Sequence, residues 1–202
     1  IAKETLPTST LNNGTQALMR FKVTANSAGN VGVGRFSLTL ATTTASVTGL
    51  DIFAFTDSAY STPVTGLSSD GGMEATDHLA ASNVVWVSSA TVLDVDATTS
   101  AGASTTVQIP AGQSRFFEVR GTVAGSATGA TVQVTLQGDS AFPALSGFMT
   151  TFNGIDTNSG ANDDFIWSPN STTTAITDDN DWTNGYGVSG PPSGGLSDVV
   201  SR

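Results

Sequence analysis

Two clusters of oxygen-bearing side chains in the last third of the chain could bind a metal. The first comprises Asp156, Asn158, Asp163 and Asp164 around a glycine turn, and the second comprises Asp178, Asp179 and Asp181. Carboxylate and amide oxygens are the ligands that Ca²⁺ takes, roughly six to eight at a time. The spacing is not that of an EF-hand, and the same residues fit an acidic solvated loop whose Asn and Asp serve turn geometry. The sequence therefore indicates calcium as the candidate metal and requires no cofactor.

Three aromatic residues in the same region have two interpretations. Trp167, Trp182 and Tyr186 lie among Asn, Asp, Gly and Thr, where few aliphatic residues are available. Flat aromatic faces can stack on sugar rings, so these side chains could bind a carbohydrate. Aromatic side chains also bury large apolar areas, so they could instead anchor a loop-rich tail to the body of the protein.

The sequence offers little for catalysis. The single histidine, His78, follows Asp77 in a polar loop, and no Gly-x-Ser-x-Gly segment indicates a partner serine. Glu118 is expected on the outward face of its strand, beside Arg120, as a solvated charge. Residues 185–190 match Gly-x-Gly-x-x-Gly, but two prolines follow where a nucleotide-binding helix would begin. We expect a protein that is not an enzyme.

Charge excludes several classes of partner. The chain has 202 residues, of which 12% are charged, and its seven Lys and Arg against seventeen Asp and Glu give a formal charge of −10. This sign disfavours nucleic acids and anionic membrane surfaces. The longest apolar runs are too short for membrane insertion. The Thr-, Ser- and Gly-rich composition resembles that of bacterial surface proteins, so we expect a mature secreted chain located at the cell surface.

Alternation of apolar and polar residues predicts an all-β protein. Residues 18–24 and 31–40 alternate clearly and are expected to form a hairpin, as are residues 115–123 and 131–137. Further strand signals occur at 51–55, 84–87, 91–93 and 105–109. No sustained helical period is present. About seven to nine short strands predict a two-sheet β-sandwich, either Ig-like or jelly-roll.

Three segments follow from this reading. Residues 1–17 form a polar lead-in that could serve as a donor strand, with Ile1, Leu6 and Leu11 as its apolar residues for assembly. Residues 18–140 form the β-sandwich core. Residues 141–202 form a loop-rich extension, rich in Asp, Asn and aromatic residues, packed on the sandwich. Both ends of the chain are expected to be free to add a strand to a neighbouring sheet edge.

Several segments resemble a known group of proteins. Residues 109–121, 164–171, 181–188 and 21–25 are similar to segments of large, uncharacterised secreted surface proteins of uncultivated ultrasmall bacteria, which have Ig-like or adhesin-like β-domains. The resemblance covers about the second half of the chain. It implies an extracellular, non-enzymatic role and brings no functional residues with it.

Together these observations favour a structural extracellular protein that assembles with copies of itself into a surface filament or layer, with strand exchange between subunits as the mechanism. The alternative is a calcium-dependent adhesin or a carbohydrate-binding module whose partners are surface glycans. A glycan screen with calcium and with chelator separates the two hypotheses.

Overall fold

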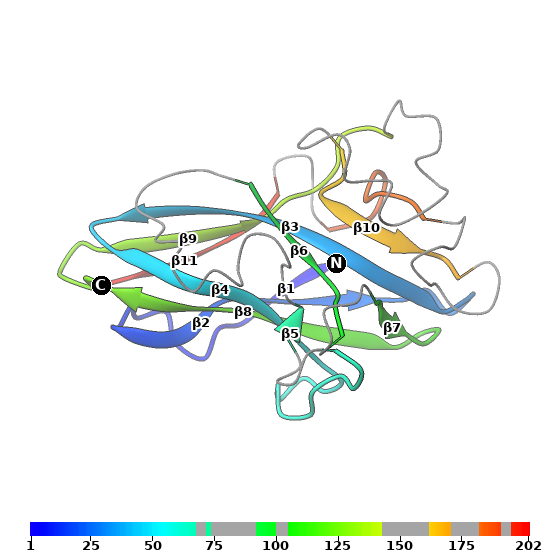
Figure 1. Ribbon diagram of the computed structural model, residues 1–202, viewed down its shortest axis with the longest axis horizontal. Helices are drawn as coiled ribbons and strands as arrows, with labels where there is room; N and C mark the ends of the chain where they lie inside the picture. The colour runs from blue at the N-terminus through cyan, green and yellow to red at the C-terminus, as the bar shows by residue number, and fades with distance from the viewer. Residues whose placement is uncertain (68–71, 74–91, 100–104, 143–161, 171–181, 191–194) are drawn as a thin grey trace.

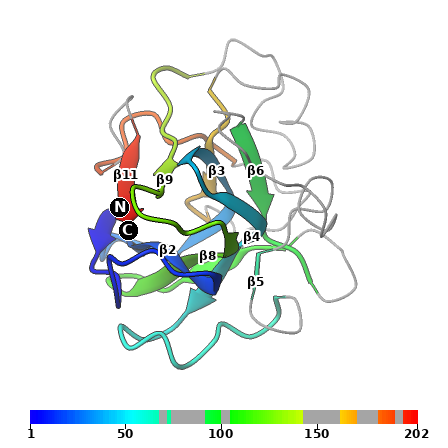
Figure 2. The ribbon, with the colours of Figure 1, turned by 90° about the vertical axis from the view of Figure 1, so that its left-hand side faces the viewer.

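The chain folds into two antiparallel β-sheets packed face to face (Figures 1 and 2). This computed structural model describes residues 1–67, 72–73, 92–99, 105–142, 162–170, 182–190 and 195–202. The predicted all-β sandwich is confirmed. In the described ranges no helix is long and apolar enough to cross a membrane. The Val84–Val87 strand signal and His78 lie outside these ranges.

The first sheet, sheet A, contains strands from both halves of the chain. Its order is β1 (Ala2–Glu4), β2 (Gly14–Thr24), β8 (Ser114–Ala124), β4 (Ser46–Phe55) and β5 (Gly72–Met73). The long strands β2 and β4 flank β8 on its two edges. The short β1 forms one edge of the sheet, where it pairs with residues 20–22 of β2.

The second sheet, sheet B, is organised around β3 (Val31–Thr43). One edge of β3 pairs with β10 (Phe165–Ser168) and then with β9 (Thr131–Leu136), and β9 continues to β11 (Leu196–Ser201). The other edge pairs with β7 (Val107–Ile109) and β6 (Val92–Asp96). In Figure 2, β9, β3 and β6 form the upper layer above β2 and β8.

Both predicted hairpins are wrong. Strands β2 and β3 are consecutive in sequence but lie in different sheets, and the same holds for β8 and β9. The connecting residues cross from one sheet to the other. Alternation along a strand determines which side chains face the core, but it does not determine the strand's neighbour.

Four phenylalanines from both sheets form the centre of the core. Phe36 lies 5.0 Å from Phe21, 4.9 Å from Phe117 and 5.3 Å from Phe165, measured between ring centroids. Three of the rings come from strands whose alternation predicted them to point inward. In β2 a register shift between Ala17 and Met19 lets Leu18 and Met19 both be buried, which simple alternation does not allow.

The ends of the chain are not free in this structure, contrary to expectation. Ser201 accepts a hydrogen bond from the Leu11 amide at 2.9 Å and donates one to the Ser9 carbonyl at 3.1 Å. Leu11 is fully buried and Leu6 is half-buried. Residues 141–202, expected to pack on the sandwich as an extension, contribute β10 and β11 to sheet B itself.

Candidate functional site

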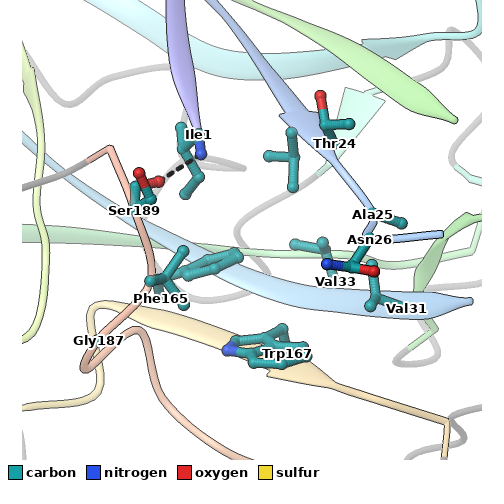
Figure 3. Close-up of a pocket in the computed structure, with 12 residues that line it drawn as sticks. Ile1, Thr24, Ala25, Asn26, Val31, Val33, Phe165, Trp167, Gly187 and Ser189 are labelled. Atoms are coloured by element: carbon teal, nitrogen blue, oxygen red, sulfur yellow. Dashed lines mark hydrogen bonds between the residues drawn. The ribbon is translucent and has the colours of Figure 1, made fainter. Parts of the chain in front are cut away.

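An apolar groove of about 440 Å³ opens between the two sheets, where β10 meets the ends of β1 and β2. Its apolar lining comprises Ile1, Val23, Ala25, Val31, Val33, Phe165, Trp167 and Val188. Figure 3 shows Phe165 and Trp167 on one side of this space, with Ile1 and Ser189 at its other end. Polar lining comes from Thr24, Asn26 and Ser189. A groove of this size and composition is suited to an apolar ligand or a protein side chain.

The segment 184–190, here called the strap, closes one side of the groove. The Ile1 ammonium donates a hydrogen bond to the Ser189 carbonyl at 2.6 Å (Figure 3). Gly190 has a positive φ of 126°, and a Cβ atom there would overlap with the backbone of Ile1. The close approach of β1 to the strap therefore requires glycine at position 190.

The three aromatic residues singled out from the sequence occupy different environments. Trp182 is fully buried, so its ring is inaccessible to a sugar. Trp167 is half-buried in the groove, and its indole donates a hydrogen bond to the Asn184 carbonyl at 2.9 Å. Tyr186 is 46% exposed and packs against Phe142, which is 60% exposed. From the sequence, Phe142 is one of several aromatic residues expected to anchor the loop-rich tail, but its side chain is more than half exposed.

Arg35 of β3 lies at the centre of a cluster of carboxylates on the outer face of sheet B. Its guanidinium donates two hydrogen bonds to Asp96, at 2.7 and 3.1 Å. Asp94 and Asp163 lie 3.9 and 3.8 Å from the same side chain. Alternation places Arg35 and Ser37 outward, yet they are only 3% and 0% exposed, because distant segments cover this face.

Asp164 lies beside this cluster, and the pKa of its carboxyl group is raised. Burial, together with the nearby carboxylates of Asp139, Asp163 and Asp94, raises its pKa to about 7. A carboxyl group in such surroundings holds its proton near neutral pH, because ionisation would add another negative charge to a poorly solvated cluster. The backbone carbonyl of Asp164 accepts a hydrogen bond from the Ser37 amide at 2.7 Å. This bond holds the backbone of Asp164 against β3.

Asp139 joins three separate parts of the chain. Its carboxylate accepts hydrogen bonds from the backbone amides of Asp164, Phe165 and Gly185, at 3.0, 3.2 and 2.7 Å. Asn184 adds two more links, because its amide donates to the carbonyls of Ala141 and Asn162 at 2.8 and 2.7 Å. These hydrogen bonds fix the strap against the start of β10.

The calcium prediction is only partly covered by the structure. Asp163 and Asp164 are the two proposed ligands that are described, and Asp163 lies close to the Arg35 guanidinium. Asp156, Asn158, Asp178, Asp179 and Asp181 lie outside the described residues. Among the residues that are described, no three acidic or histidine side chains are arranged to hold a metal ion. Calcium binding remains a prediction from the sequence.

Glu118 is buried rather than solvated, which corrects the expectation from alternation. It is 3% exposed and forms ion pairs with both Arg20 and Arg120 on the outer face of sheet A. The Arg20 guanidinium stacks 3.9 Å from the centre of the Tyr60 ring, and that of Arg120 lies 4.2 Å from that of Phe53. Both carboxylate oxygens of Glu118 are thus engaged by guanidinium groups, Oε2 by Arg20 and Oε1 by Arg120.

Comparison of the chain with protein-family models, with curated proteins and with solved structures finds no significant match. The groove, the strap and the carboxylate cluster are therefore interpreted from their own geometry.

Proposed function

We propose that this chain is a structural extracellular protein, a subunit of a surface filament or layer in which neighbouring copies exchange β1. Support comes from the way β1 is held. It is a three-residue edge strand whose only strand partner among the described residues is residues 20–22 of β2. Such a short edge strand, followed by a connecting segment, can be donated to a second copy while every contact is kept, which is the basis of domain swapping.

The contacts of β1 are specific as well as few. Lys22 lies 2.7 Å from Glu4, and Lys3 lies 3.4 Å from Asp198. Ile1 lines the groove and meets the strap at Ser189. A donated β1 would form these same ion pairs and would line the same groove on the acceptor. The acceptor therefore selects β1 in preference to an arbitrary strand.

The connection to the rest of the chain limits how far β1 can reach. Ser9 and Leu11 are held by hydrogen bonds to Ser201, so residues 5–8 form the movable linker. Four extended residues span at most about 14 Å, so an acceptor must lie close to the donor. Because each copy donates β1 at one place and accepts it at another, the exchange can continue from copy to copy and generate an open filament.

The absence of cysteine makes this proposal easy to test. Ala2 and Lys22 are directly opposite each other in the β1–β2 pair, at a separation suited to a disulfide. Single variants Ala2→Cys and Lys22→Cys, one of them carrying an affinity tag, are refolded together at high concentration and oxidised. Exchange should produce a disulfide between the tagged and untagged chains, and electron microscopy of the unmodified protein should show filaments.

The matched control replaces Lys22→Cys by Thr122→Cys, an exposed position on β8 with a different strand partner. This pair should cross-link only at the background level of random collision. If the Ala2→Cys and Lys22→Cys pair cross-links no better than the control, and the unmodified protein forms no filaments, the assembly proposal is wrong.

The alternative function is a calcium-dependent adhesin or carbohydrate-binding module. The exposed Tyr186 ring, together with half-buried Trp167, is the observation that favours it. This hypothesis predicts glycan binding that requires calcium and disappears in chelator, whereas a scaffold subunit binds no glycan in either condition.

A further inference from the structure

Gly190 and the start of β1 approach each other more closely than a residue with a side chain at position 190 would allow. A Cβ atom built on Gly190 would lie 1.9 Å from the carbonyl oxygen of Ile1, 2.7 Å from its carbonyl carbon and 2.9 Å from its Cα. All three are backbone atoms, so no change of side-chain rotamer relieves the overlap. The neighbouring Ser189 carbonyl accepts a hydrogen bond from the Ile1 nitrogen at 2.6 Å (Figure 3). The strap therefore contacts the backbone path that leads into β1.

The strap is held in place by contacts that do not involve β1. The Gly185 amide donates a hydrogen bond to the Asp139 carboxylate at 2.7 Å, and the Asn184 side chain donates to two backbone carbonyls at 2.8 and 2.7 Å. The Val188 amide donates to the Gly185 carbonyl at 3.0 Å, and the Val188 side chain packs against the core. By contrast, β1 is a three-residue strand at the edge of sheet A. A side chain at position 190 should therefore displace β1 and leave the strap in place.

β1 docks on two surfaces that come from different parts of the chain. β2 supplies the backbone pairing, and its Lys22 lies 2.7 Å from Glu4. The strap supplies the second surface, at Gly190. Neither surface contains residues of β1, and β2 remains paired with β8 along most of its length. A folded chain that has released its own β1 therefore still presents both surfaces to the β1 of another copy.

We infer that the strap is part of the site that accepts β1 from a second copy, and that Gly190 is the residue that makes a chain able to accept it. A Gly190→Ala chain keeps an unaltered β1 and can donate it, but its strap excludes an incoming β1. Such a chain ends a filament, because it joins a neighbour that accepts β1 and offers no acceptor of its own. In a filament this role depends on the proposed exchange of β1, whereas the exclusion of a chain's own β1 does not.

Cross-linking between an Ala2→Cys donor and a Lys22→Cys acceptor measures acceptance directly. Gly190→Ala is placed in the acceptor in one mixture and in the donor in another. In the acceptor it should lower the yield of interchain disulfide by about tenfold or more, because the added methyl group overlaps with backbone. In the donor it should leave the yield unchanged or raise it, because it releases the donor's own β1. A general loss of stability would act alike from either chain.

The same substitution is also tested in a single chain that carries both cysteines, at a concentration too low for exchange. Gly190→Ala should slow formation of the intramolecular disulfide by about tenfold or more, because β1 spends less time beside β2. The matched control is Gly187→Ala. Gly187 lies in the same strap with a positive φ of 79°, and a Cβ atom there meets nothing within 4 Å beyond its chain neighbours. This control introduces the backbone strain without the overlap, so it should change the rate by about twofold at most.

Electron microscopy tests the consequence for assembly. A small fraction of Gly190→Ala chains mixed into the unmodified protein should shorten its filaments, whereas Gly187→Ala chains should not. Equal interchain yields with and without Gly190→Ala in the acceptor would overturn the inference while leaving β1 exchange intact. No cross-linking between the two single-cysteine chains would contradict the proposed function itself. In that case the intramolecular rate decides whether Gly190 admits β1, and equal rates for Gly190→Ala and Gly187→Ala would show that it does not.

Discussion

The ammonium of Lys3 lies 3.4 Å from the carboxylate of Asp198, although the two residues are 195 positions apart in sequence. Lys3 belongs to β1 at the edge of sheet A, and Asp198 belongs to β11 at the edge of sheet B. The ion pair therefore spans the open side of the sandwich. Inward-pointing charges at sheet edges also disfavour unspecific pairing with other strands.

Lys3→Ala should have little effect on stability but should accelerate β1 exchange. The Lys3 side chain is 45% exposed, so the ion pair contributes at most about 1 kcal/mol to the free energy of unfolding. Its loss removes one of the few contacts that hold β1 in place. Urea denaturation and the rate of cross-linking between Ala2→Cys and Lys22→Cys chains measure the two effects. An unchanged cross-linking rate would show that β1 release does not depend on this pair.

Arg35→Met should strongly destabilise the fold. The guanidinium is 3% exposed and compensates Asp96, Asp94 and Asp163, so its removal leaves several poorly solvated carboxylates together. Loss of one partner from a buried ionic cluster costs roughly 3 kcal/mol or more. Adding Asp96→Asn to this variant should recover part of the loss, and chemical denaturation of the four proteins in the cycle measures the coupling. If the changes in unfolding free energy of Arg35→Met and Asp96→Asn simply added, the two side chains would not interact as the ion pair indicates.

Asp139→Ala should loosen the strap from β10. The change leaves the amides of Asp164, Phe165 and Gly185 without their acceptor, and each buried donor without a partner costs about 1 kcal/mol or more. Hydrogen exchange of the Gly185 amide should accelerate, and the Trp fluorescence should change because Trp167 is hydrogen-bonded to Asn184. Asp139→Asn keeps one acceptor oxygen, so its Gly185 exchange rate should lie between those of the unmodified chain and Asp139→Ala.

Stability should fall as the pH rises from about 4 to above 7. The pKa of Asp164 is raised from 3.8 to about 7 in the folded state, mainly by burial, so the folded chain retains a proton that the unfolded chain releases. Its contribution to stability is complete below pH 3.8 and is lost as the pH passes through 7. The pKa of Asp139 is also raised by burial and acts in the same direction.

Asp164→Asn tests this dependence, because asparagine imitates the protonated carboxyl. At pH 8 the variant should be more stable than the unmodified chain by about 1 to 2 kcal/mol, less than the full pKa shift implies because solvent screens a partly exposed group. The difference should shrink toward pH 4. Asp198→Asn, which removes a negative charge that does not act on Asp164, serves as the control. If the free energy of unfolding changed with pH in the same way for the unmodified chain and for Asp164→Asn, Asp164 would not be the source of the pH dependence.

The sequence predicts the faces of the strands well and their partners poorly. Phe36 and Leu38 point into the core as alternation requires, because burial of apolar side chains selects one face of a strand. The assignment of β2 and β3 to different sheets depends instead on long-range packing, which leaves no local pattern. Arg35 and Glu118 point outward as alternation predicts, but they are not exposed, because residues distant in sequence or neighbouring ionic partners cover them.

The sequence predicts only part of the candidate site, because the site also depends on packing between residues far apart in the chain. Trp167 and Tyr186 were singled out by their residue type, and their positions beside the groove depend on where β10 and the strap lie. Phe142 and Asp139 carry no local signal, since an aromatic residue and an acid near a predicted strand end are common. Their roles arise from contacts with residues 162–165 and 184–186, more than 20 positions away.

The position of β11 has a consequence for the order in which the molecule acquires its structure. β11 pairs with β9 along its whole length, Val200 is fully buried, and Ser201 is hydrogen-bonded to residues 9 and 11 near the start of the chain. While the ribosome is still adding residues before 196, these contacts cannot form and the edge of β9 has no partner. Completion of the core must therefore wait until residues 196–201 have been synthesised, long after the β2, β8 and β4 strands that they help to cover.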